Sequence, residues 1–314
     1  MIRMGIQSGL GIVEDFEKEL AYFLGVKHVI GTSSGTMADT IALAILKNKF
    51  PDKKKVLVPA LTFIAQINSI IYNGLEPVFL DIDKEVEFKE DYLCYFPVHL
   101  LGVPAEVPTD IPVIEDACEA FGSKLRGKYC GTIADMGTFS FYNTHTLRTG
   151  EGGAIVTNDD DYADMARILR NHGSRSEHPL EKFKFDVIGF NGKMSAESAK
   201  IGLENMKTIE RSLEKRHENY LYLGGKEKAV EYIVPHGFPA FYSNRDSKMV
   251  ELFQKGIDSR KIFSCIPTQE KAYTYLGYEK GDFPKSELVG DTGLYVPCHE
   301  NLTKKQLELI KANL

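Results

Sequence analysis

The sequence predicts an α/β fold built on a large, mostly parallel, seven-stranded sheet. Three observations support this prediction. Short apolar runs bounded by turn residues alternate with amphipathic helical patterns along the first half of the 314-residue chain. The apolar runs are nearly continuous, as expected of strands that helices cover on both faces. The chain is 43% hydrophobic and 26% charged, which suits a soluble enzyme with a large core.

Each expected strand is a short apolar run that ends at a turn. In chain order the strands cover Val26–Gly31, Lys55–Pro59, Pro77–Asp81, Tyr95–Leu100, Val113–Asp116, Met136–Phe141 and Ala154–Thr157. The expected helices show an apolar face at helical spacing. They cover Val13–Leu24, Met37–Lys47, Phe63–Asn73, Asp159–Asn171, Ser195–Tyr222 and Asn301–Leu314.

The long helical region Ser195–Tyr222 divides the chain into two predicted domains. Residues 1–222 contain the strands of the parallel sheet and form a large domain. Residues 223–314 mix short strands and helices and form a small C-terminal α+β domain. The polar stretch Ser174–Lys184 is expected to be a loop.

Charge, hydropathy and cysteine usage argue against several classes of protein. The net charge is −6 and no basic run stands out, so we expect no nucleic-acid partner. No apolar run approaches the roughly 20 residues of a membrane span, and the amino end lacks a signal-peptide core. We therefore expect a cytoplasmic protein without membrane association. The five cysteines are widely spaced and form no Cys-x-x-Cys pattern, so we expect neither a metal site nor disulfides.

Small polar residues open the helix after the first strand, in the run Ser33-Ser34-Gly35-Thr36. Amides at a helix start bind anions, and glycine lets a phosphate approach the backbone. An ordinary helix cap produces the same pattern, so this motif by itself leaves both interpretations open.

Two more candidates follow later strands. Asp116 ends the apolar strand Val113–Asp116, so its carboxylate lies at the sheet edge where open α/β folds bind ligands. Phe63 follows the strand that ends at Pro59. Taken singly, Asp116 could be a helix N-cap and Phe63 a core residue.

His145 lies between Ser140 and the glycine-rich turn Gly150-Glu151-Gly152-Gly153. An imidazole exchanges protons near neutral pH, which suits general acid–base catalysis. A lone histidine is equally typical of a surface or core position, so the flanking pattern decides its interpretation.

The order and spacing of these motifs resemble the nucleotide-sugar aminotransferase family of fold-type I pyridoxal-phosphate (PLP) enzymes. The resemblance runs from about Gly11 to Leu314 and implies the fold-type I architecture of a large and a small domain. The family has a cofactor-binding lysine where this chain has His145. Histidine has no primary amine, so the resemblance is to the dehydratase branch, which removes the C3 hydroxyl of nucleotide-linked 4-keto-6-deoxysugars.

The resemblance also assigns roles to individual residues. The implied cofactor contacts are Gly35, Thr36 and Met37 through main-chain amides, Phe63 on the ring, Asp116 at the ring nitrogen, Glu119 at the ring hydroxyl, Ser140 at the phosphate, and Asn191. Family members use this asparagine across a subunit interface, which implies a homodimer with shared active sites. Glu119 stands where most aminotransferases have glutamine, and a carboxylate near His145 would raise the pKa of that histidine.

Substrate contacts are implied in two further segments. Arg260 and Phe263 lie in the run Gly256–Phe263, which resembles the dehydratase branch, and Arg260 could grip the nucleotide diphosphate. Lys193 follows Asn191 in a Gly-x-Asn-x-Lys pattern. A surface salt bridge for Arg260 and a plain surface charge for Lys193 are the alternatives.

The implied function is a dehydratase that uses PLP and pyridoxamine phosphate (PMP), takes its amino group from glutamate and uses His145 as acid and base. GDP-4-keto-6-deoxymannose is the expected substrate, which implies a place in deoxysugar biosynthesis for lipopolysaccharide O-antigen. No cysteine lies between Cys130 and Cys265, which argues against an iron–sulfur cluster. Two alternatives stay open: a sugar aminotransferase, including one whose lysine was replaced, and an inactive homologue that binds PLP.

Overall fold

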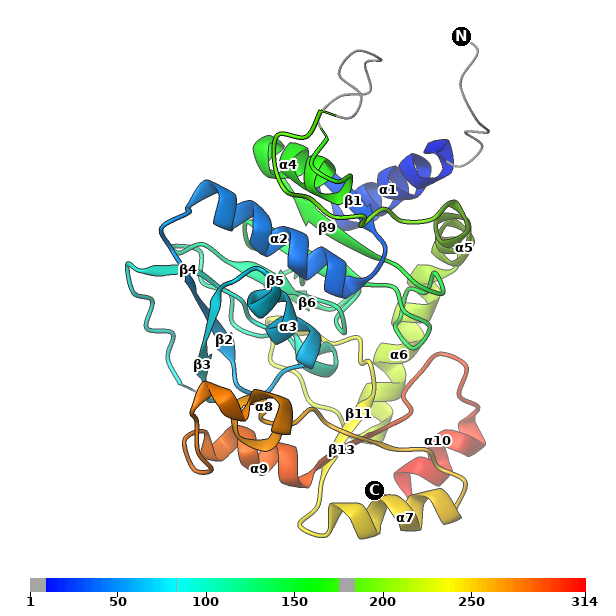
Figure 1. The fold of residues 1–314 in the computed structure, drawn as a ribbon. Coiled ribbons are helices and arrows are strands. Elements are labelled where there is room, and N and C mark those ends of the chain that lie inside the picture. The colour runs from blue at the N-terminus through cyan, green and yellow to red at the C-terminus, as the bar shows by residue number, and fades with distance from the viewer. Residues whose placement is uncertain (1–9, 83, 175–183) are drawn as a thin grey trace.

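The computed structural model describes residues 10–82, 84–174 and 184–314 (Figure 1). The predicted loop Ser174–Lys184 lies almost entirely outside the described residues. The helices are α1 (Leu10–Leu24), α2 (Gly35–Lys49), α3 (Ile64–Tyr72), η1 (Leu100–Gly102), α4 (Asp160–Arg170), α5 (Ala196–Met206), α6 (Ile209–Leu223), α7 (Arg245–Gln254), α8 (Ile266–Gln269), η2 (Lys271–Leu276), α9 (Pro284–Thr292) and α10 (Lys304–Lys311). None of the helices in these ranges combines the length and apolarity needed to cross a bilayer.

The strands are short and lie mostly in the first half of the chain. They are β1 (His28–Thr32), β2 (Lys55–Pro59), β3 (Glu76–Leu80), β4 (Tyr92–Tyr95), β5 (Ile114–Asp116), β6 (Lys124–Leu125), β7 (Lys128–Tyr129), β8 (Met136–Ser140), β9 (Gly153–Thr157), β10 (Glu231–Tyr232), β11 (Phe238–Phe241), β12 (Arg260–Lys261) and β13 (Gly293–Val296).

Strands β3-β2-β4 and β5-β8-β9-β1 form the two halves of one central sheet. All neighbours pair in parallel except β9, which runs antiparallel to β8 and β1. The parallel bridges Tyr95↔Val113 and Val98↔Asp116 join the halves. Through these bridges the main-chain amide of Asp116 donates to Pro97 O at 2.9 Å. The described residues thus confirm the predicted mostly parallel, seven-stranded sheet.

Two predicted elements differ from the observed ones. The strand expected at Tyr95–Leu100 is displaced: β4 begins and ends earlier, and the chain then turns into η1. Pro97 interrupts the apolar run and lacks the amide that would continue a ladder. The helix expected over Ser195–Tyr222 is two helices, because Thr208 leaves the helical backbone (φ −122°, ψ 10°) between α5 and α6.

Side chains alternate between the two faces of the sheet, and each face has its own core. Ile30 and Ile155 pack against α2, α3 and α4 on one face. Val29 and Val156 pack against α1 and α5 on the other. Figure 1 shows α2 and α1 on opposite sides of the strands β1 and β9. This double covering explains why the strand sequences are almost wholly apolar.

Residues after α6 pack in two places. The antiparallel strands β11-β13-β12 pack with α7 and α10 around a separate core that includes Leu294 and Leu307. Helices α8, η2 and α9 instead join the core of the parallel sheet through Ile266, Tyr273 and Phe283. Figure 1 shows α8 and α9 near β2 and β3, away from α7 and α10. The boundary between 1–222 and 223–314 stays a prediction.

Asp81 fixes α9 to the end of β3. Its carboxylate accepts hydrogen bonds from Ser286 N (2.8 Å), Ser286 Oγ (2.6 Å) and Lys285 N (3.1 Å). We expect Asp81→Ala to lower the free energy of unfolding by about 2–4 kcal/mol, because buried donors lose their acceptor. Urea denaturation measures this change. The control Asp91→Ala removes only an exposed partner of Lys55 and should change little. Equal effects of the two variants would contradict the prediction.

Candidate active site

Helix α2 presents its amino terminus at the edge of the sheet, just after β1 ends. Ser34 caps this helix, and its side-chain oxygen accepts a hydrogen bond from Met37 N at 3.1 Å. The amides of Gly35 and Thr36 lie in the first turn, where a helix supplies no acceptor of its own. These two amides form the predicted anion-binding end. The amide of Met37 donates to Ser34 in this structure, and its contact with the cofactor stays a prediction.

Gly35 lies against the ends of two other strands. A Cβ atom on residue 35 would be 2.6 Å from Ser140 Cβ, at the end of β8, and 3.0 Å from Cys118 Sγ. Only glycine permits so close an approach without displacing these neighbours. The structure therefore brings the predicted residues Gly35 and Ser140 together, beside the segment that follows Asp116.

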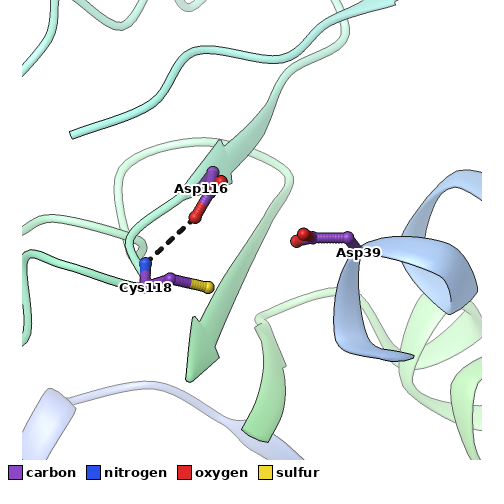
Figure 2. Close-up of side chains that lie close together, drawn as sticks. All are labelled: Asp39, Asp116 and Cys118. Carbon is purple, nitrogen blue, oxygen red and sulfur yellow. Dashed lines mark hydrogen bonds between the residues drawn. The ribbon is translucent and has the colours of Figure 1, made fainter. Parts of the chain in front are cut away.

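Asp116 ends β5 and is only 5% exposed. Its Oδ1 accepts a hydrogen bond from Cys118 N at 3.0 Å. The Asp39 side chain projects toward it from α2 (Figure 2), and single ligand atoms of Asp39, Asp116 and Cys118 lie within 4.8 Å of one another. Burial raises the pKa of Asp116, while burial and the charge of Asp116 raise the pKa of Asp39. Ionising both carboxyl groups is therefore unfavourable.

Phe63 and Phe263 meet beside this edge. Phe63 precedes α3 and is 50% exposed, which excludes the alternative of a core phenylalanine. The centroids of the two rings are 5.0 Å apart with an interplanar angle of 38°. Phe63, which was predicted to contact the cofactor, therefore lies against Phe263, which was predicted to contact the substrate.

Glu119 is buried, and each of its oxygens has its own neighbour. Oε2 accepts a hydrogen bond from Leu101 N at 2.8 Å, and Oε1 lies 3.8 Å from His236 Nε2. Leu101 adopts a left-handed conformation (φ 52°), which is uncommon for leucine. The pKa of Glu119 is raised to about 7, mainly by burial; the Leu101 amide opposes this rise, and the charge of Asp116 contributes to it.

His145 lies in the turn after β8, where its amide donates to Tyr142 O at 2.9 Å. Its ring faces that of His236, with centroids 5.1 Å apart. Nδ1 of His145 is buried and has no hydrogen-bond partner among the described residues. Burial and, to a lesser extent, the charge of Arg216 lower the pKa of His145 to about 4. His145 is therefore neutral at pH 7 and can accept a proton.

The predicted effect of Glu119 on His145 is wrong. Glu119 lies closer to His236, and the charge that acts on His145 is the positive charge of Arg216. Arg216 is 3% exposed on α6, donates to Glu300 through Nε at 2.8 Å and to Pro235 O through Nη1 at 3.1 Å. A buried imidazole near a cation resists protonation. The pKa of His145 is therefore lowered, whereas the sequence had indicated that Glu119 would raise it.

Arg260 reaches the same group of residues from β12. It pairs with Tyr295 of β13, and the Tyr295 ring lies 5.8 Å from that of His236, centroid to centroid. Burial lowers the pKa of His236, and the charges of His145, Arg216 and Arg260 lower it further. Arg260 forms no salt bridge with any described carboxylate, so the alternative of a surface salt bridge is not met.

The segment around Asn191 lies beside the start of α2. Gly192 O accepts a hydrogen bond from Ser33 N at 2.9 Å. Asn191 is exposed, and its Oδ1 accepts a hydrogen bond from Lys193 Nζ at 2.9 Å. Burial lowers the pKa of Lys193, as does the charge of Arg170. The role of Asn191 across a subunit interface, and that of Lys193 with substrate, stay predictions.

Sequence reasoning missed Asp39, His236, Arg216 and Tyr295. A signal existed for Asp39, which is a lone carboxylate in the otherwise apolar centre of α2. No local signal marks His236, because a histidine between proline and glycine is typical of any turn. Its position beside His145 depends on how residues after α6 pack against the sheet.

The arrangement fits a phosphorylated aromatic cofactor such as PLP. Gly35 lets the start of α2, whose first amides have no acceptor within the helix, pack directly beside Ser140. Phe63 offers a half-exposed ring, and Asp116 a buried carboxylate for a ring nitrogen. The buried Nδ1 of His145 lacks a partner within the described ranges, as expected of a group that serves a ligand.

Comparison with known proteins gives consistent matches along the chain. A model of the DegT/DnrJ/EryC1/StrS aminotransferase family matches residues 6–314. GDP-perosamine synthase of Caulobacter vibrioides is 32% identical, covering 96% of this chain and 89% of that protein. GDP-4-keto-6-deoxy-D-mannose 3-dehydratase of Yersinia pseudotuberculosis is 31% identical, covering 94% and 88%.

A solved structure has the same fold. It is a histidine-to-asparagine mutant of GDP-4-keto-6-deoxymannose-3-dehydratase with bound GDP-perosamine. It matches with a TM-score of 0.87 at 24% identity and covers 97% of this chain and 92% of that one. At this identity the likeness supports the fold alone, which confirms the expected fold-type I architecture.

The raised pKa of Glu119 gives a test of its burial. The unfolded chain releases this proton near pH 4.5 and the folded chain only near pH 7, so stability is lost as pH rises between them. Glutamine cannot ionise, so the Glu119→Gln variant should not lose this stability. We expect the pH-dependent fall in the free energy of unfolding to be smaller by up to about 3 kcal/mol in this variant. Denaturant unfolding at pH 4.5 and pH 7.5 measures it. Glu218→Gln, at an exposed position of α6, is the control. Parallel pH profiles for wild type and Glu119→Gln would contradict the prediction.

Proposed function

Because the chain belongs to the DegT/DnrJ/EryC1/StrS aminotransferase family, we propose that it is a dehydratase that removes the C3 hydroxyl group of a nucleotide-linked 4-keto-6-deoxyhexose. The family comprises sugar aminotransferases and dehydratases that use PLP and PMP. GDP-4-keto-6-deoxymannose is the proposed substrate and glutamate the proposed amino donor. The chain is 32% identical to the synthase and 31% identical to the dehydratase, and these values are too close to choose between the two reactions.

The observation that carries the proposal is His145, at the position of the family's cofactor lysine. A lysine can hold the cofactor covalently and displace an aminated product, whereas an imidazole can do neither. The neutral ring of His145, with its buried Nδ1 unpartnered within the described residues, retains the ability to move protons. Without a competing amine, elimination at C3 becomes the favoured outcome.

The chain's own residues would hold the cofactor at the sheet edge. The amides of Gly35 and Thr36 and the Ser140 hydroxyl would bind the phosphate, and Asp116 would bind the ring nitrogen. Phe63 would stack on the ring, and Asn191 of the partner subunit would complete the phosphate site. When bound, PMP supplies an amine for the C4 ketone and an electron sink for loss of the C3 hydroxyl.

His145 and its neighbours would handle the proton. When PMP is bound, His145 would accept the proton released from the carbon that carries the cofactor's amine and would deliver it to the departing C3 oxygen, which leaves as water. The low pKa of His145 keeps its ring neutral before the reaction and makes the imidazolium a strong acid afterwards. The side chains of Arg216 and Arg260 place positive charge near His145 and His236. Glu119, beside His236, adds a carboxyl group whose pKa is about 7. Arg260 would bind the substrate diphosphate.

The net reaction balances without an external oxidant or reductant. The sugar loses one oxygen atom at C3, and glutamate becomes 2-oxoglutarate with release of ammonia. One water leaves at C3, and one is consumed when the enamine product hydrolyses to a 4-keto-3,6-dideoxysugar.

The proposal predicts the products directly. Purified protein with PLP, glutamate and GDP-4-keto-6-deoxymannose should give a sugar nucleotide that lacks the C3 oxygen and one ammonia per turnover. Mass spectrometry and an ammonia assay measure both. A 4-amino sugar would establish the aminotransferase alternative. Absence of turnover with GDP-, UDP-, dTDP- and CDP-linked 4-keto-6-deoxyhexoses would favour the inactive homologue.

The role of His145 predicts a specific loss. His145→Asn should reduce the rate of C3 deoxygenation by about 10²–10⁴-fold, because the proton acceptor is removed. Binding of PMP should persist, as measured by its absorbance and fluorescence. His28→Asn, at the start of β1 beside Asp160, is the matched control and should retain activity. Full activity of His145→Asn would exclude this histidine as the acid–base group.

A further inference from the structure

We infer that Asp39 and Asp116 share one proton, so that a neutral Asp39 donates a hydrogen bond to the carboxylate that Asp116 offers to the cofactor ring nitrogen. Asp39 is therefore a positioning residue that acts through Asp116. The inference rests on the proposed cofactor contact of Asp116. It holds equally for a dehydratase and for an aminotransferase.

Asp39 occupies a position where a charge is strongly disfavoured. It lies in α2 between the buried residues Ala38 and Ile41 and is itself 2% exposed. An ionised carboxylate in such surroundings needs a cation or several hydrogen-bond donors. Asp39 Oδ1 has no hydrogen-bond partner in the described part of the chain. A helix built for packing alone would have an apolar residue at this position.

The neighbour of Asp39 is a second acid. Figure 2 shows the Asp39 side chain extending from α2 toward Asp116 and Cys118. Asp116 Oδ1 accepts from Cys118 N, and Asp39 Oδ1 has no hydrogen-bond partner among the described residues. A carboxyl–carboxylate hydrogen bond requires an oxygen separation of about 2.5–3.0 Å. One carboxylate oxygen of Asp39 and one of Asp116 lie within 4.8 Å of each other, and the shared proton requires the two side chains to close the remaining gap.

The charge of His99 lowers the pKa of Asp116, yet burial keeps the pKa of both acids raised. Neither carboxylate forms an ion pair with a cation in residues 10–82, 84–174 or 184–314. Facing them are Thr138 of β8, the Cys118 thiol and, farther away, Glu119 and His99. Burial and the two aspartates raise the pKa of Cys118, which keeps the thiol neutral. Two adjacent buried acids without a counter-ion retain one proton between them.

The shared proton has a consequence for the cofactor. A neutral donor stabilises the Asp116 anion without adding charge, and this anion then favours a protonated ring nitrogen. Without the donor, Asp116 becomes more basic and draws the proton away from the ring. A protonated ring is the better electron sink.

The first experiment uses the protein without cofactor. The infrared spectrum of the wild type at pH 8 should contain the C=O band of one protonated carboxylic acid, and Asp39→Asn and Asp39→Leu should both lack it. Thr40→Val, a buried substitution at the next position of α2, should retain the band. Presence of the band in Asp39→Leu, or its absence from the wild type, would overturn the inference.

The second experiment measures the ring nitrogen of ¹⁵N-labelled PMP bound to each variant at pH 7.5. The wild-type shift should indicate a protonated nitrogen, and Asp39→Leu should shift strongly toward the unprotonated value. Asp39→Asn retains an N–H donor and should stay close to wild type. Identical shifts in all three would overturn the role of Asp39. An unchanged shift in Asp116→Asn would show instead that Asp116 does not contact the ring, which separates the two failures.

Metal analysis tests whether a bound cation, in place of a shared proton, compensates the charge of the two aspartates. The ligand atoms of Asp39, Asp116 and Cys118 lie within 4.8 Å of one another, which is close enough for the three side chains to bind one metal ion. One divalent ion per chain in the purified apoprotein, lost in Asp39→Leu and removed by chelator, would replace the shared proton and overturn the inference. Less than a tenth of an ion per chain supports it.

Discussion

The close approach of Gly35 to Ser140 and Cys118 is the constraint on which this site depends. A side chain at position 35 would push the start of α2 away from the ends of β5 and β8. The amides of the first helical turn would then no longer share an edge with Ser140 and Asp116. The apolar strands and the helices that cover them fix this edge, and glycine allows the polar groups to converge there.

Burial, more than direct ion pairing, governs the chemistry of the site. It lowers the pKa of His145 to about 4 and raises that of Glu119 to about 7, because both groups lose the hydration of their charged forms. The result is an acid–base region with few full charges near neutral pH. Such a region suits proton movement, since each group can change its protonation state within a small energy range.

The residues after α6 complete this region. His236 precedes β11, Arg260 lies on β12 and Tyr295 on β13, so one small antiparallel sheet delivers all three. Arg216 ties this sheet to α6 by donating to Pro235 O before β11 and to Glu300 after β13. The same arginine lowers the pKa of His145, so the contact that connects the parts of the chain also keeps the imidazole neutral.

The sequence by itself determined most of the strands and helices of the sheet and pointed to its edge as the candidate site. Apolar runs and helical spacing are local properties, so strands such as Lys55–Pro59 and Met136–Ser140 and the glycine that begins α2 were predictable. The tertiary structure alone decided which groups meet. Glu119 turned toward His236, Met37 gave its amide to Ser34, and Asp39 came to face Asp116. These outcomes depend on contacts between residues far apart in the chain and on burial, and pKa values follow burial, which no local pattern encodes.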